Sequence, residues 1–209
     1  NYDANKFNSN RLKEVFSKFK NNPHKYLDRD DKNVFDVYQK YLVNNNSLDF
    51  DDLILYTIKL LKKDNFLKEY YNKRYEYILV DEFQDTNKVQ YELIKLLAGS
   101  KKNIFVVGDP DQSIYSFRGA NYENQNRFII ELSPKQIILN KNYRSKTNIL
   151  DASNNVIKFN SSRVAAKDLY SDLGEGVPIT YKLRASDRDE AYFVTKLIER
   201  FIESGYNYD

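Results

Sequence analysis

Two adjacent acids directly after an apolar run are the residues in this chain best suited to chemistry. Ile78-Leu79-Val80 leads straight into Asp81 and Glu82. A short, continuous apolar run predicts a strand buried on both faces, as in parallel sheets flanked by helices. In open sheets of that kind, ligands bind at the carboxyl ends of the strands, where both acids would emerge. One carboxylate placed there can hold Mg²⁺, and its neighbour can orient or deprotonate a water that attacks a phosphate.

A solvated loop is the alternative for these two acids, but two further loops also hold functional residue types at predicted strand ends. Gly108-Asp109-Pro110-Asp111-Gln112 follows an apolar run over residues 103–107, and Tyr143 with Arg144 follows another over 136–139. The glycine, proline and acids of the first loop are typical of a turn. Arg144 suits either a structural ion pair or a cation that stabilises charge on a transferred phosphoryl group.

Aromatic residues next to a cation follow Gln112. Tyr115 and Phe117 are two positions apart, so an extended backbone points both rings the same way, with Arg118 beside them. Rings interleaved with a cation suit single-stranded nucleic acid, because every base offers a face for stacking. The alternative is that Ile114 and Phe117 simply pack into the core.

Hydrophobic periodicity predicts helices first and then alternating strands and helices. Apolar residues recur at helical spacing from residue 1 to about 72. Three acids, Asp49, Asp51 and Asp52, crowd the first turn of one helix, where the helix dipole favours negative charge. From Tyr75 onward the alternation predicts an α/β fold with a parallel sheet. Predicted strands cover 75–80, 103–107, 136–139 and 177–183, and predicted helices cover 89–97 and about 123–131. A further helix is predicted from an N-cap at Ser145 to Ile157, and another from an N-cap at Ser186 to a stop at Gly205.

Composition bounds the class of protein. The chain has 209 residues, 33 basic and 30 acidic side chains and a net charge of +3, which by itself does not argue for nucleic acid. It has no cysteine, which fits a reducing cytoplasm, and no apolar run as long as a membrane span. The chain begins with Asn1 and contains no Met, which predicts an internal piece of a longer protein.

Three of these stretches closely resemble motifs II, III and IV of the UvrD/PcrA/Rep family of superfamily 1 DNA helicases. They are Val-Asp-Glu-Phe-Gln-Asp-Thr-Asn at 80–87, Val-Gly-Asp-Pro-Asp-Gln-Ser-Ile-Tyr-Ser-Phe-Arg-Gly-Ala at 107–120 and Leu-Asn-Lys-Asn-Tyr-Arg-Ser at 139–145. Residues 48–54 also look like the family's stretch upstream of motif II. The resemblance runs from about residue 30 to 209 but covers only the middle part of such a helicase. It implies an incomplete RecA-like parallel sheet flanked by helices, with an N-terminal helical segment and the start of a second RecA-like domain.

The resemblance also implies ATP and Mg²⁺ as cofactors. By it, Asp81 coordinates the Mg²⁺ of Mg-ATP, and Glu82 activates the attacking water. Gln112 senses the γ-phosphate and links it to the segment that follows. Tyr143 stacks on the adenine, and Arg144 reaches across from the second motor domain as an arginine finger.

The implied partners are single-stranded DNA, DNA duplex junctions and the remainder of the helicase chain. No membrane partner is expected. Tyr115, Phe117 and Arg118 are implied to meet single-stranded DNA, with the rings stacking on bases, and Phe50 to add a further aromatic contact. Position 117 is Phe where many members of the family carry Trp, which keeps a stacking face but makes it smaller.

A larger departure is that the chain has no Gly-x-x-x-x-Gly-Lys-Ser/Thr loop to hold phosphates. We interpret the chain as the central fragment of an ATP-dependent helicase, moving 3′ to 5′ as its relatives do, and expect the fragment alone to be inactive. Residues 1–72 would end an accessory subdomain, 73–133 would form the second half of the first motor domain, and 134–209 would begin the second.

Two other functions compete with this interpretation. One is a non-catalytic module, derived from a helicase, that binds single-stranded DNA or regulates a partner; it would bind DNA irrespective of nucleotide. The other is a metal-dependent nuclease using Asp81, Glu82, Asp85 and Asp109. Its two-metal site needs carboxylates that converge, whereas successive strand residues point to opposite faces.

Overall fold

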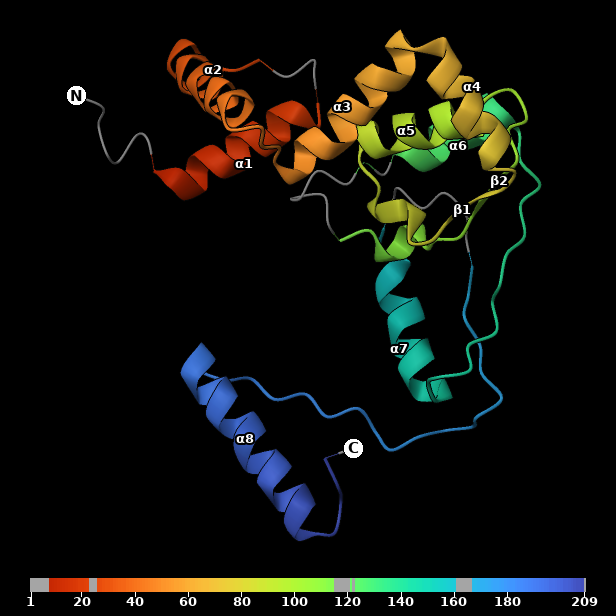
Figure 1. Ribbon diagram of the computed structural model, residues 1–209. Helices are drawn as coiled ribbons and strands as arrows, with labels where there is room; N and C mark the ends of the chain where they lie inside the picture. Colours follow the sequence, from red (N-terminus) through yellow and green to blue (C-terminus); the bar gives the residue numbers. More distant parts are fainter. Residues whose placement is uncertain (1–7, 23–25, 115–120, 122, 161–166, 209) are drawn as a thin grey trace. The chain divides into compact units, whose positions relative to one another are not determined.

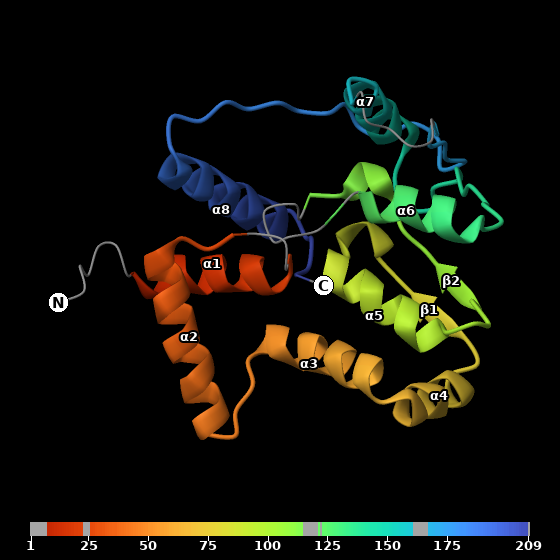
Figure 2. The same ribbon diagram turned by 90° about the horizontal axis from the view of Figure 1, so that it is seen from above.

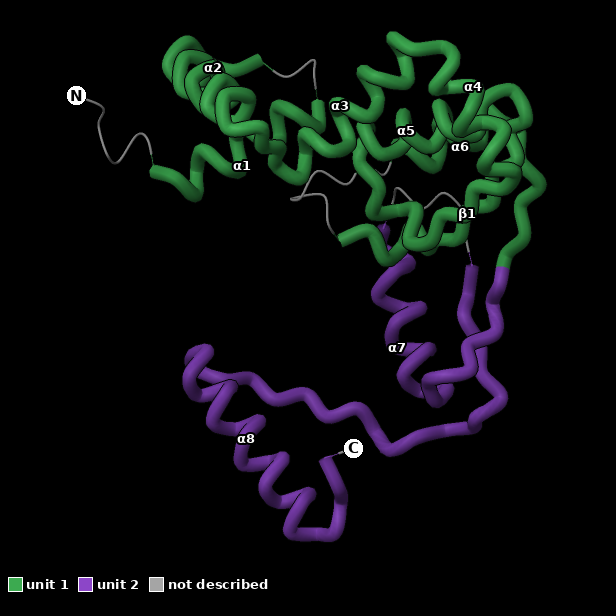
Figure 3. The backbone as a smooth tube through the Cα atoms, in the orientation of Figure 1, with its two compact units in different colours: residues 1–138, 161–166 green, residues 139–160, 167–209 purple. Residues whose placement is uncertain are grey.

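The computed structural model describes residues 8–22, 26–114, 121, 123–160 and 167–208, and these form two compact units (Figures 1 and 3). The first unit extends to residue 138, and the second contains residues 139–160 and 167–208. The described elements are α1 Ser9–Lys20, α2 Arg29–Asn44, α3 Phe50–Lys63, α4 Asn65–Arg74, β1 Ile78–Val80, η1 Phe83–Asp85, α5 Lys88–Ala98, β2 Ile104–Val106, η2 Pro110–Gln112, α6 Glu123–Leu132, α7 Thr147–Ile157 and α8 Asp187–Glu203, where η marks a 3₁₀ turn. None of the described helices is long and apolar enough to cross a lipid bilayer.

The predicted helical start of the chain is confirmed for its described residues, which form α1 to α4. Side-chain contacts join α1 to α2 and α1 to α3. The ring of Phe16 in α1 lies 5.2 Å from that of Phe35 and 5.6 Å from that of Tyr38, both in α2. The ammonium of Lys20, at the end of α1, lies 2.6 Å from a carboxylate oxygen of Asp49 and 2.8 Å from one of Asp52, at the start of α3. These contacts fix the start of α3 against the end of α1.

The predicted parallel sheet is present as two short strands. β1 pairs with β2 in parallel, with Ile78 opposite Ile104 and Val80 opposite Val106. One face of this pair packs on a core centred on Phe83, Tyr91 and Phe128, to which η1, α5 and α6 contribute. Figure 2 shows α5 beside β1 and β2, with α3 along the other side of α5.

The prediction that these strands are buried on both faces is wrong. Leu79 is 72% exposed, and its partner Phe105 is 60% exposed. Successive side chains of a strand point to opposite faces, so helices that cover one face leave the other open. The strands are also shorter than predicted, because regular pairing covers only three residues of each.

In the second unit, an irregular segment holds α7 by side-chain hydrogen bonds. Asn154 donates from its amide to the carbonyl of Leu169 and accepts from the Leu169 N–H, at 2.9 and 3.1 Å. Asn148 makes the same kind of exchange, with the carbonyl of Val177 and the N–H of Gly176. The helix is therefore fixed by backbone groups of residues 169–177.

The predicted strands at 136–139 and 177–183 are not present in the structure. An isolated parallel bridge joins Lys141 to Tyr170, outside both predicted ranges. Ile137, Leu139, Val177 and Tyr181 are all more than 70% exposed. An extended segment becomes a ladder only when a neighbouring strand accepts and donates its hydrogen bonds, and apolar content alone does not supply that neighbour.

The sequence predicted the N-caps of two helices in the second unit, and the predicted N-cap of α7, Ser145, is wrong by one residue. The N-cap of α7 is Lys146, because the N–H of Ser145 donates to the side chain of Asn142 at 2.7 Å and Ser145 still belongs to the preceding turn. The cap of α8 is confirmed, since Ser186 accepts from the N–H of Asp189 at 3.3 Å. The predicted stop is also confirmed, because Gly205 lies directly after the last turn at a φ of 96°.

Candidate functional site

The carboxyl ends of β1 and β2 are joined by backbone hydrogen bonds that continue past the strands. The N–H of Val107 donates to the carbonyl of Val80 at 2.8 Å, and the N–H of Phe83 donates to the carbonyl of Val107 at 3.0 Å. The parallel register therefore places the loop of Asp81 and Glu82 against the loop that begins at Gly108, as expected at this edge of a parallel sheet.

Asp81 and Glu82 occupy a sharp turn between β1 and η1. A carboxylate oxygen of Asp81 accepts from the N–H of Glu82 at 2.9 Å. Glu82 has φ 49° and ψ 43°, the left-handed region that residues with a Cβ seldom occupy. Both side chains are exposed. The turn ends the strand at once, so the alternation that would separate two successive strand residues does not apply to these acids.

The neighbouring loop is linked to this turn through Gln84, to which the sequence analysis assigned no role. The Gln84 amide donates to a carboxylate oxygen of Glu82 at 2.7 Å and accepts from the N–H of Asp109 at 3.0 Å. Gln112 in turn donates to a carboxylate oxygen of Asp109 at 2.8 Å. Gln84 lies inside the motif that carries the family resemblance, and only its hydrogen-bond partners in the folded structure indicate this connection.

The residues present fit a magnesium ion held together with a nucleotide. Mg²⁺ is commonly bound by one or two carboxylates, with phosphate and water oxygens completing its shell. Asp81 supplies one exposed carboxylate at the strand end. Within the described ranges, no group of three or more His, Asp or Glu side chains is arranged to hold a metal by protein ligands alone.

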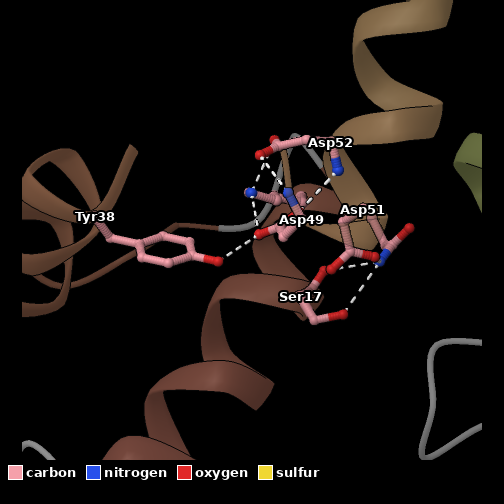
Figure 4. A network of polar contacts seen from close by, with 7 residues as sticks. Ser17, Tyr38, Asp49, Asp51 and Asp52 are labelled. Carbon is pink, nitrogen blue, oxygen red and sulfur yellow. Dashed lines mark hydrogen bonds and ion pairs between the residues drawn. The ribbon is translucent and has the colours of Figure 1, made fainter. Parts of the chain in front are cut away.

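Phe50 lies in the first turn of α3, and its ring is 89% exposed. The acids around it are engaged in polar contacts, shown in Figure 4. Asp51 and Asp52 lie in the first turn of α3, as predicted, whereas Asp49 precedes it as the N-cap and forms a capping box with Asp52, which was not predicted. The Lys20 ion pairs join this box, and Asp51 accepts from the amide of Asn21 at 2.7 Å.

This cluster shifts the pKa of two of its members. Burial alone would raise the pKa of Asp49, but hydrogen bonds from Lys20, from the Asp52 N–H and from Tyr38 outweigh it and hold the pKa below its ordinary value. Burial, followed by the hydrogen bond to Asp49, raises the pKa of Tyr38 to about 12. An ionised Asp49 therefore belongs to the folded cluster, in which its charge is compensated.

Tyr143 and Arg144 lie in the second unit, on the turn before α7. Asn142 shapes this turn, because its side-chain oxygen accepts from the N–H groups of Arg144 and Ser145 at 2.9 and 2.7 Å. Tyr143 is 79% exposed, and the ammonium of Lys141 lies 5.4 Å from its ring centre. The Arg144 side chain is also exposed. The turn thus presents an aromatic face and a guanidinium to solvent.

The predicted DNA contacts Tyr115, Phe117 and Arg118 lie outside the described residues. The described chain before them ends at Ile114, which is 68% exposed and is not packed in a core as the alternative reading had it. Tyr115 follows Gln112 closely in the sequence. Between them, the hydroxyl of Ser113 donates a hydrogen bond to the carbonyl of Gln84 at 3.3 Å.

A separate hollow of about 740 Å³ lies on the α4 and α5 side of the first unit. Basic side chains contribute to its lining, including Lys68, Lys88 and Arg127, together with the acids Glu69 and Glu92. The residues at the strand ends do not line it, so it is distinct from the candidate site.

Comparison with known proteins agrees with the resemblance seen in the motifs. Residues 1–132 match the UvrD/REP helicase N-terminal domain, and residues 137–209 match the UvrD-like helicase C-terminal domain. An ATP-dependent DNA helicase PcrA from Staphylococcus epidermidis is 48% identical over 176 residues, and one from Staphylococcus aureus is 46% identical over 176 residues. Each alignment covers 84% of this chain but 24% of the relative, so the chain spans about a quarter of the length of these relatives. The chain belongs to the UvrD/REP helicase family.

Proposed function

We propose that this chain is the central part of an ATP-dependent DNA helicase that couples ATP hydrolysis to movement along single-stranded DNA, in the 3′ to 5′ direction. The observation that carries the proposal is the junction of two strand-end loops, in which hydrogen bonds through Gln84 and Asp109 connect Glu82 to Gln112 and the Glu82 N–H donates to Asp81. Family membership supports it, since the relatives named above are ATP-dependent DNA helicases.

In this proposal, Asp81 binds the Mg²⁺ of Mg-ATP, and Glu82 orients the attacking water and accepts its proton. Gln112 contacts the γ-phosphate. Tyr143 stacks on the adenine, and Arg144 stabilises charge on the transferred phosphoryl group. The exposure of all five side chains in the described structure is compatible with these roles, because each must meet a ligand.

DNA is assigned to the aromatic residues. Phe50, at the start of α3 and 89% exposed, offers a face on which a base can stack. Tyr115, Phe117 and Arg118 are also assigned to contact single-stranded DNA, with the two rings stacking on bases. Duplex junctions are the expected substrate of the whole protein, and the cytoplasm its expected location.

We further assign residues 1–72 to the end of an accessory subdomain and 73–133 to the second half of a first RecA-like domain. Residues 134–209 would begin a second RecA-like domain. The 209 residues contain no glycine-rich phosphate loop, so the remainder of the helicase chain is expected to supply it.

The test is to measure ATP hydrolysis by the full-length protein that contains these residues, with and without single-stranded DNA. Glu82→Gln removes the proposed base and should lower the DNA-stimulated rate by about 100-fold or more. Glu76→Gln, an exposed acid before β1, is the matched control and should leave the rate unchanged.

Two results would contradict the proposal. Hydrolysis that survives in Glu82→Gln would remove Glu82 from the chemistry. DNA binding that ignores nucleotide, without any hydrolysis by the unsubstituted protein, would instead support the non-catalytic binding module. The 209-residue chain by itself is expected to hydrolyse no ATP, which the same assay measures directly.

A further inference from the structure

A chain of hydrogen bonds, which includes one backbone N–H, connects Gln112 to Glu82. It passes from the Gln112 amide to the Asp109 carboxylate, from the Asp109 N–H to Oε1 of Gln84, and from Nε2 of Gln84 to Oε2 of Glu82, at 2.8, 3.0 and 2.7 Å. Residues 84 and 109 are 25 positions apart, so this connection exists only because β1 and β2 lie side by side.

Gln84 is the buried centre of this chain. It is 6% exposed, whereas Glu82 and Gln112 at the two ends are exposed. A buried amide is normally satisfied by other buried groups, because an unpaired one costs free energy. Gln84 instead uses its donor on an exposed carboxylate that could be solvated by water, and its acceptor on the backbone of the neighbouring loop.

The local backbone is shaped around this amide. A Cβ at Gly108 would lie 2.5 Å from Oε1 of Gln84 and 3.1 Å from the backbone nitrogen of Phe83, so only glycine leaves room for the side chain to pass. At its other end, the left-handed conformation of Glu82 turns the carboxylate back toward Gln84. A strained conformation at a residue with a Cβ persists only where the surrounding structure holds it.

We infer that Gln84 is a positioning residue that fixes the Glu82 carboxylate and ties its orientation to the loop carrying Gln112. The inference rests on the proposed function, in which Glu82 activates water and Gln112 contacts the γ-phosphate. A donor on one carboxylate oxygen leaves the other oxygen to face the water and holds the group in one rotamer. Movement of the Gln112 loop on nucleotide binding is then transmitted through Asp109 and Gln84 to Glu82.

The sharpest test is Gln84→Glu in the complete protein. The carboxylate keeps the acceptor for the Asp109 N–H but replaces the donor to Glu82 with a second negative oxygen. If Gln84 orients Glu82, kcat for ATP should fall about 10- to 100-fold, while KM for ATP and the affinity for single-stranded DNA stay within about twofold. A purely structural role would instead lower the melting temperature without separating kcat from KM.

Two further variants allow the test to be made even if the Gln84→Glu protein does not fold. Gln84→Met has a similar length and lacks both hydrogen bonds, and Gly108→Ala displaces the Gln84 side chain without changing it; both should show the same selective loss of kcat. Glu76→Gln, an exposed acid before β1 whose side chain takes no part in the hydrogen-bonded chain, is the control and should retain the original kcat.

The outcomes separate this inference from the proposed function. If Glu82→Gln abolishes hydrolysis but Gln84→Glu and Gln84→Met both keep the original kcat, the positioning role is wrong and the proposed function stands. If Glu82→Gln retains hydrolysis, the proposed function itself is wrong. A kcat that falls in the Gln84 variants, with KM unchanged, supports the role assigned to Gln84.

Discussion

At the scale of single residues, Lys20 is a buried cation of the first unit that is paired with two carboxylates. Its side chain is 3% exposed and lies between Asp49, at 2.6 Å, and Asp52, at 2.8 Å. The Asp52 side chain is equally buried. Burying a charge is costly unless it is paired, so each member of this cluster depends on the others.

We predict that Lys20→Met destabilises the chain by about 3 kcal/mol or more, because it leaves two carboxylates near the end of α1 without their cation. The measurement is chemical denaturation followed by circular dichroism. Lys18→Met is the control: Lys18 pairs with Glu14 at 3.5 Å on an exposed surface, and its loss should change the free energy of unfolding by less than about 0.5 kcal/mol. Equal effects of the two substitutions would contradict the role given to Lys20.

At the scale of elements, α5 connects the helical start of the chain to the sheet, and α4 closes its C-terminal end. The Asn72 amide, in α4, donates to the carbonyls of Leu96 and Leu97 at 2.7 Å each. These carbonyls belong to the last turn of α5, which has no partners for them within the helix. Gly99 follows at a φ of 55°, and a Cβ there would lie 2.6 Å from the Asn72 side chain.

Asn72→Ala should destabilise the chain by about 1–3 kcal/mol, because two partly buried carbonyls lose their donor. Thermal or chemical unfolding measures this difference. The exposed Asn65, at the start of the same helix, provides the matched substitution Asn65→Ala, for which we expect a change within about 0.5 kcal/mol. If Asn72→Ala is as mild as Asn65→Ala, water replaces the amide at no cost and the cap is dispensable.

At the scale of the whole chain, the two-stranded sheet leaves an apolar face open. Leu79 and Phe105 lie opposite each other on it, flanked by Tyr77 at 65% exposure and Val107 at 46%. Contiguous exposed apolar side chains next to a strand edge promote association between chains. Ile78 and Ile104, on the other face, are partly buried.

We predict that the 209-residue chain self-associates at high concentration and that Leu79→Thr combined with Phe105→Thr reduces this association without loss of stability. Threonine introduces a β-branched side chain, which suits a strand, while removing apolar surface. Sedimentation velocity measures the association. The same change on the covered face, Ile78→Thr, should instead lower the free energy of unfolding; a monomeric original chain at high concentration would refute the prediction.

The sequence by itself was sufficient to identify the family, to locate the main helical segments and to predict that the strands near residues 78–80 and 104–106 run parallel. The motifs at residues 80–87 and 107–120 were sufficient for the family. Helical periodicity and local caps, such as Ser186 with Asp189, depend on residues three or four apart, so they can be read along the chain.

Only the tertiary structure decided which side chains meet across longer separations. The Gln84 bridge spans 25 positions, the Lys20–Asp49 pair spans 29, and the bond between Asn87 and Asn21 spans 66. It also decided that one face of the sheet is open and that the apolar runs at 136–139 and 177–183 form no strands. The physical reason is that such contacts depend on which elements pack together, and the residue types at each site are compatible with several partners until packing selects one.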